Sequence, residues 1–176
     1  GFECLEATTT GDFNTGFGTG AGRALTSGQC NTLIGNTAGS LIQTGVRNTV
    51  IGYSALDDMN GAQNDNTVIG ARAGQIPVTG NSYTIIGADA DAVTGLANAT
   101  AIGYEAYVST SNSLVLGGIT GTNGGTNTNV GIGITNPTGR LHVRNNAQDI
   151  NGHFVTTFED MTDIIVAEYD ESSTSD

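Results

Sequence analysis

Nine glycines divide this chain into segments of nearly constant length. They fall at Gly1, Gly18, Gly35, Gly52, Gly70, Gly87, Gly103, Gly117 and Gly133, so that consecutive members lie about 17 positions apart. A repeat this short cannot hold a pair of helices, so each repeat must bury its apolar side chains against the repeats on either side. The sequence therefore predicts an all-β fold, a β-solenoid or β-roll with coils of about 17 residues.

The residues before each glycine repeat one short phrase. Its copies are Asn31-Thr32-Leu33-Ile34, Asn48-Thr49-Val50-Ile51, Asn66-Thr67-Val68-Ile69, Tyr83-Thr84-Ile85-Ile86 and Ala99-Thr100-Ala101-Ile102. The glycines that follow, with Gly18 before them, are expected to turn the coils: Gly35, Gly52, Gly70, Gly87 and Gly103. Side chains alternate along a strand, so the third residue of each phrase faces away from the threonine and the isoleucine. Both faces carry an aliphatic column.

One coil has a single interior, so one of these two columns needs an outside cover. We expect the coil core to be the column Ile34, Ile51, Ile69, Ile86 and Ile102. The opposite column, Leu33, Val50, Val68, Ile85 and Ala101, is then expected to lie on the axis of an assembly, covered by further copies of the chain.

Polar positions of the repeat also form columns. The threonines share a face with the isoleucines and are expected to be stacked internal hydroxyls; the alternative is a flat threonine array of the kind found on ice-binding solenoids. The preceding asparagines, from Asn14 to Asn66, predict a ladder that satisfies backbone amides at the turn. A small residue three places after each glycine predicts a crowded site where the chain packs inward. A second glycine, eight to ten places after the first, predicts the opposite turn of the coil, and therefore two strands per coil.

The repeat predicts three parts of the chain. Residues 1–118 form the roll, whose first coil lacks its first half, so we expect further repeat sequence upstream. Residues 119–140 form a glycine- and asparagine-rich connector, and residues 141–176 form a C-terminal β segment. Within that segment, 153–158 and 164–169 are expected strands.

Composition argues against several classes of partner. The net charge of −12 and only five arginines disfavour binding to nucleic acid. The sequence contains no run of about 18 apolar residues, so membrane insertion is not expected. Cys4 and Cys30 fall at different positions of the repeat and are expected to be free thiols.

Chemical motifs are weak, and we expect no catalytic residue, metal site or cofactor. His142 and His153 could form rings around an axis but lack a His-x-His pair. The acidic pairs Asp57–Asp58 and Asp89–Asp91 have no neighbour that would raise one pKa for glycoside cleavage. An enzyme is therefore not expected.

The phrases resemble the repeat regions of phage tail fibres, and are similar to the heads of trimeric bacterial surface adhesins. The resemblance rests on the asparagine-threonine-aliphatic-glycine coils and on the closing Val130-Gly131-Ile132-Gly133, Asn136-Pro137 and Leu141-His142-Val143. It implies a parallel homotrimer with an interlaced C-terminal β segment. The final Ser172-Ser173-Thr174-Ser175-Asp176 resembles the junction at which the intramolecular chaperone domain of tail fibres is released, with Thr174 and Ser175 flanking the cleaved bond.

The resemblance implies a structural and host-attachment component of a phage tail fibre, located in the virion. Its partners would be two further copies, other tail or fibre proteins and a host-surface receptor, a glycan or a protein. Receptor contacts are expected on the loops 57–65, 75–82 and 90–98. The alternatives are a trimeric adhesin or filament at the bacterial surface and, more remotely, an ice-binding solenoid.

Overall fold

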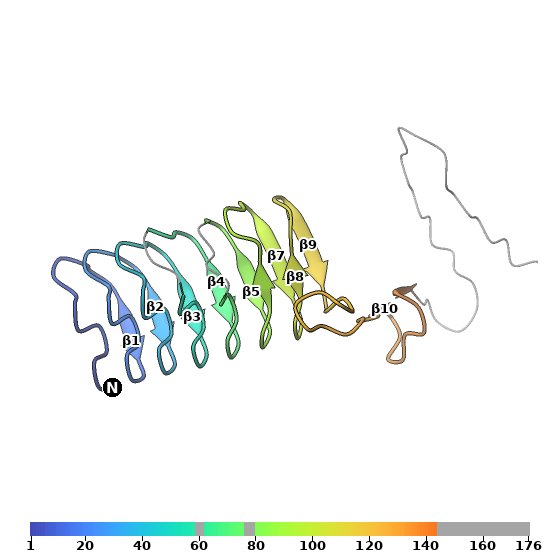
Figure 1. The fold of residues 1–176 in the computed structure, drawn as a ribbon, viewed down its shortest axis with the longest axis horizontal. Coiled ribbons are helices and arrows are strands. Elements are labelled where there is room, and N and C mark those ends of the chain that lie inside the picture. The colour runs from blue at the N-terminus through green and yellow to red at the C-terminus, as the bar shows by residue number, and fades with distance from the viewer. Residues whose placement is uncertain (59–61, 76–79, 144–176) are drawn as a thin grey trace, which may run out of the picture.

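The computed structural model describes residues 1–58, 62–75 and 80–143, and it is a parallel β-solenoid (Figure 1). One strand from each coil joins a seven-stranded parallel sheet that runs the length of the roll. Its strands are, in order, β1 (Thr15–Phe17), β2 (Thr32–Ile34), β3 (Thr49–Ile51), β4 (Thr67–Ile69), β5 (Thr84–Ile86), β7 (Ala99–Ile102) and β9 (Ser113–Leu116). The predicted solenoid and the predicted length of its coils are confirmed.

Equivalent residues of successive phrases pair with one another across this sheet. Thr32 pairs with Thr49, Leu33 with Val50 and Ile34 with Ile51, and the same register continues to β9. Each added coil thus stacks like on like, which extends identical columns of side chains along the roll.

The interior of the roll is filled by the third residue of each repeated phrase. Leu33, Val50, Val68, Ile85 and Ala101 are all fully buried within one chain. The sequence-based assignment of the two columns is therefore wrong: the column expected on an axis between copies is the coil core, and the column expected in the core, Ile34, Ile51, Ile69, Ile86 and Ile102, lies on the outer face. The physical reason is that the outer face also carries the threonines, whose hydroxyls would lose hydrogen bonds to water if they were enclosed.

The small residues that follow the glycines are buried as predicted. Ala21, Ala38, Ala55, Ala73, Ala90 and Ala106 have no exposed surface and pack against the core column. They lie where the chain turns back from the strand, and the short side chain lets the opposite wall of the coil approach the sheet.

The opposite wall mostly lacks the second strand that the sequence predicts. Within the described residues, its named strands are β6 (Asp91–Ala92) and β8 (Tyr107–Val108), which pair with each other. In the earlier coils the chain places alternate residues in the left-handed region, for example Ser54 at φ 48° and Leu56 at φ 51°. This conformation bends the chain away from a strand, and its amides still bond from coil to coil, as in Leu56 N to Ala73 O at 2.9 Å.

The predicted asparagine ladder is confirmed. Asn48 Nδ2 donates to Asn31 Oδ1 at 2.9 Å and to the carbonyl of Gln63 at 2.7 Å, and Asn48 Oδ1 accepts bonds from the backbone and side chain of Asn66. The ladder ends at Tyr83, whose backbone N–H donates to Asn66 Oδ1. The buried Tyr83 hydroxyl then donates to Val93 O at 3.1 Å and accepts from Leu96 N at 2.8 Å, so the phenol replaces the next rung.

Removing one rung should be costly. We expect Asn48→Ala to lower the free energy of unfolding by about 2–3 kcal/mol, because it leaves the backbone and side-chain amides of the buried Asn66 without their acceptor. It also removes the shorter of two hydrogen bonds to the Gln63 carbonyl, which keeps only the bond from Val46 N at 3.2 Å. Asn81 is the matched control, since its Oδ1 also accepts an amide from the preceding coil but lies exposed. Urea unfolding should show a loss below about 1 kcal/mol for Asn81→Ala. Equal losses in the two variants would contradict this role of the buried ladder.

Beyond the roll, the described chain forms a connector and one small parallel sheet. Gly118 makes a bridge to Ala106, and the connector side chain Asn123 donates to the backbone carbonyl of Asp89 at 2.7 Å. The strands β10 (Val130–Ile132) and β11 (Leu141–Val143) pair with each other (Figure 1). The expected strands 153–158 and 164–169 and the junction at Thr174 and Ser175 lie outside the described residues.

Candidate interaction surface

The outer face of the seven-stranded sheet is the most regular surface of the roll. From each of β1 to β5 and from β7 it presents a threonine and, two residues later, Phe17 or one of the isoleucines. Neighbouring strands of a sheet lie about 4.8 Å apart, so seven strands in one sheet make this surface a long, narrow stripe along the roll. We call it the Thr/Ile face, and it includes Leu114 and Leu116 of β9.

The Thr/Ile face is uncharged and becomes more apolar at the C-terminal end of the roll. The structure pairs Thr100 with Leu114 and Ile102 with Leu116, so both outward positions of β9 are leucines. Leu114 is 60% exposed and Leu116 44% exposed. Contiguous exposed apolar surface of this kind makes the Thr/Ile face the candidate interaction surface of the roll.

The threonines do not occupy the internal position that the sequence suggested. They are half-buried by one another on the Thr/Ile face, and Thr15 of the first strand is exposed. The stacked hydroxyls therefore face outward beside the isoleucines, so the Thr/Ile face carries one polar and one apolar column.

Three of the four acidic residues considered for catalysis, Asp57, Asp89 and Asp91, have structural partners. Asp57 accepts a hydrogen bond from Ser40, and Asp89 forms a bidentate pair with Arg72, with distances of 2.7 Å. Asp91 is buried and accepts the amide of Ala92 at 2.8 Å. Each of these three carboxylates is therefore held by a neighbour of its own, as expected for residues that stabilise the coils.

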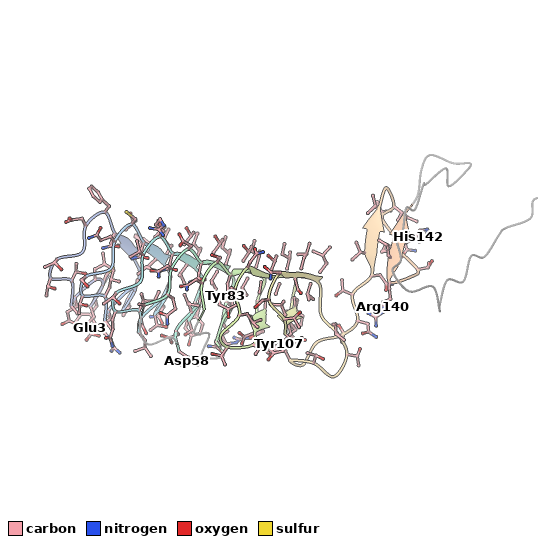
Figure 2. All side chains as sticks on the ribbon, turned by 90° about the horizontal axis from the view of Figure 1, so that it is seen from above. Glu3, Asp58, Tyr83, Tyr107, Arg140 and His142 are labelled. Atoms are coloured by element: carbon pink, nitrogen blue, oxygen red, sulfur yellow. The ribbon has the colours of Figure 1, made fainter. Side chains whose placement is uncertain are left out.

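The histidines are not brought together in the part of the chain that is described. His142 lies in β11, where Thr138 N donates to its Nδ1 at 3.3 Å, and Figure 2 shows it in the small unit beyond the roll. His153 lies outside the described residues. Among residues 1–58, 62–75 and 80–143, there is no cluster of three or more histidine, cysteine, aspartate or glutamate side chains that could hold a metal ion.

The loops expected to carry receptor contacts are only partly described. Residues 59–61 and 76–79 fall outside the description, and in the third loop Ala90, Asp91 and Ala92 are buried. The exposed part of that loop is confined to Thr94, Gly95 and 97–98.

Ion pairs join neighbouring coils at two corners of the roll. Arg47 Nε lies 2.6 Å from Asp65 Oδ1, and Arg72 Nε lies 2.7 Å from Asp89 Oδ1. The hydrogen bond from Arg47 lowers the pKa of Asp65, and both arginines have raised pKa values because of their carboxylate partners. The pairs are exposed, so each adds little to stability.

Two exposed tyrosines beside the second of these pairs were missed by motif analysis. Tyr53 and Tyr104 directly follow Gly52 and Gly103, and they are 57% and 60% exposed. Aligning the residue after each glycine would have found them, because the intervening coils carry only Ala71 and Ala88 at this position. We call these four residues the tyrosine edge.

Comparison with protein-family models, with curated proteins and with solved structures gave no match to this chain. The fold alone defines the class of this chain, an all-β parallel solenoid built from coils of about 17 residues. Within the described ranges, no helix is long and apolar enough to cross a membrane.

Proposed function

We propose that this chain is a rod segment of a homotrimeric fibre, in which three copies lie parallel and cover one another's Thr/Ile faces. The fibre is a phage tail fibre that attaches the virion to a host surface. The observation that carries the proposal is the continuous, uncharged Thr/Ile face along the seven-stranded sheet, which the described residues of one chain leave uncovered.

The composition of the Thr/Ile face at its C-terminal end supports burial of that end against an apolar surface. β9 replaces the threonine column by Leu114, and the isoleucine column by Leu116, so contact with water becomes less favourable toward this end. Three copies stacked in register would cover equivalent leucines with one another, because parallel assembly matches like positions.

The small unit after the roll supports the same arrangement. Within the described residues, β10 and β11 form a sheet of only two strands, with Ile132 57% exposed and Leu141 51% exposed. Two strands alone are marginally stable in water, so this unit needs further strands or a covering surface. Interlaced copies of the same unit would supply both, as the resemblance to tail fibres implies.

The trimer gives the rod its biological use. A stack of identical coils is long and stiff, and three copies present each weak receptor contact three times, which raises avidity without a stronger single contact. Other tail or fibre proteins and a glycan or protein receptor on the host would be its partners. A trimeric adhesin or filament at the bacterial surface would use the same assembly.

Ice binding is the second candidate, because the threonine column lies on the outside. A flat threonine array is the feature that ice-binding solenoids use, and an outward threonine column is present on β2 to β5 and on β7. The leucines of β9 and Phe17, 72% exposed, interrupt that array at its two ends. A purified sample that produces thermal hysteresis would favour this function.

Thiol labelling separates the two functions. We place one cysteine at Ile69 or, as the exposed control, at Asn36, in a background with Cys4→Ala and Cys30→Gly. The fibre predicts that Ile69→Cys reacts with a bulky maleimide at least about tenfold more slowly than Asn36→Cys, since reaction requires the interface to open. An open ice-binding face predicts that the two rates are similar, and that result would overturn the fibre proposal.

A further inference from the structure

The tyrosine edge lies along the turns that follow the strands and contains two large side chains separated by two small ones. Tyr53 and Tyr104 stand three coils apart, and neighbouring coils are spaced by about 4.8 Å along the stack. Ala71 and Ala88 lie between them and are half-buried. The two phenol rings therefore lie at the ends of a stretch whose residues at this position have small side chains.

The next residue of each turn adds hydrogen-bonding groups along the same stretch. Arg72 and Asp89 form their bidentate pair there, in the two coils that lie between those of Tyr53 and Tyr104. Glu105 accepts a hydrogen bond from Tyr104, which raises the pKa of the phenol above its usual value. The Arg72 guanidinium and the Asp89 carboxylate hold each other in a fixed orientation, and each keeps hydrogen-bonding positions that the pair does not use. The Glu105 carboxylate likewise keeps acceptor positions beyond the one used by Tyr104.

We propose that the tyrosine edge binds a neutral, extended oligosaccharide that runs along the roll from Tyr53 to Tyr104. This inference deepens the proposed host attachment and rests on it for its biological meaning, although the site is formed by one chain. The two phenol rings take the C–H faces of sugar rings at the two ends, and the Arg72–Asp89 pair and Glu105 bind hydroxyls between them.

The spacing and charge favour this ligand class. Each coil advances the edge by about 4.8 Å, close to the length that one sugar ring adds to an extended chain. Aromatic faces carry partial negative charge and attract polarised C–H groups, while the tyrosine hydroxyl remains in water. Acidic glycans are disfavoured, because Asp89, Glu105 and the net charge of −12 repel them.

The test uses the whole chain, residues 1–176, on an array of neutral oligosaccharides (maltose, cellulose, chitin and mannan series, two to eight rings), with sialylated and sulfated glycans beside them. We expect binding to one neutral series, with chains of four or more rings bound better than shorter ones. Tyr53→Ala and Tyr104→Ala should each weaken binding by about tenfold, and Tyr104→Phe should retain most of it because the ring remains.

Phe13→Ala is the control, since Phe13 is also an exposed aromatic, 84% exposed, at another corner of the roll. The proposal is overturned if no neutral series binds, if only acidic glycans bind, or if Phe13→Ala weakens binding as much as the tyrosine variants do. The mass of each sample separates this proposal from the fibre: a trimer that binds no glycan contradicts only the site, and a monomer that binds through the tyrosines contradicts only the fibre.

Discussion

Gly52→Ala is expected to lower the free energy of unfolding by more than about 3 kcal/mol. Gly52 has a φ of 141°, a conformation that is open almost only to glycine, and adopting it costs other residues about 1–3 kcal/mol. A Cβ at Gly52 would also lie 2.6 Å from the carbonyl carbon of Gly70 in the next coil. Backbone atoms cannot rotate away, so the two coils would have to separate.

Gly20→Ala is the graded control for this prediction. Gly20 has a φ of 66°, and an added Cβ would have only the Thr37 methyl nearby, at 3.5 Å. Left-handed strain alone should then cost about 1–2 kcal/mol. Urea unfolding of the two variants compares the costs directly. A Gly52→Ala protein as stable as Gly20→Ala would show that close stacking at the turn glycines does not limit stability.

Charge placed on adjacent residues of β4 should have two different effects. Val68 is fully buried in the coil, so an aspartate there is an unpaired buried charge that costs several kcal/mol, enough to unfold a marginally stable chain. Ile69 faces outward, so Ile69→Asp should keep the coil folded while three like charges separate the copies. Circular dichroism and light scattering should therefore show an unfolded Val68→Asp chain and a folded Ile69→Asp monomer.

For each of the two variants, one outcome would contradict the prediction. A folded Val68→Asp protein would mean that the middle column of the strand is not the core. An Ile69→Asp protein that unfolds would mean that the isoleucine column contributes to folding of the single chain. If Ile69→Asp stays associated, the copies meet through some other surface.

The repeat made the solenoid predictable because one short phrase determines every coil. The regular period, the asparagines at Asn31, Asn48 and Asn66 and the alanines after the glycines each satisfy a local requirement that recurs in the same register. Stacking like on like then follows from the sequence without knowledge of distant contacts.

The direction in which each strand faces could not be read from hydrophobicity. Val50 and Ile51 are both aliphatic and adjacent, so the alternation identified two faces but not which one the coil encloses. Two factors decide which face the coil encloses: the cost of enclosing the Thr49 hydroxyl and the path of the turn. The path of the turn depends on residues in the left-handed region, such as Arg72 and Leu56, which have no special sequence signature. The same positions explain why most coils lack a second strand.

The tyrosine edge was missed for a different reason. Tyr53 and Tyr104 are far apart in the chain, and no linear motif connects residues that only stacking brings to one edge. Their common place in the coil appears only when the chain is aligned by its glycines, and their neighbours Arg72 and Asp89 become a pair only through contact between coils.

The outward Thr/Ile face is, in our proposal, covered by two further copies of the chain. Light scattering on residues 1–176 in solution tests this proposal most directly. We expect a particle of three times 17.9 kDa at micromolar concentration, with the circular dichroism of a β protein. A folded monomer of 17.9 kDa would contradict the fibre, because the face would then be stable in water without a cover.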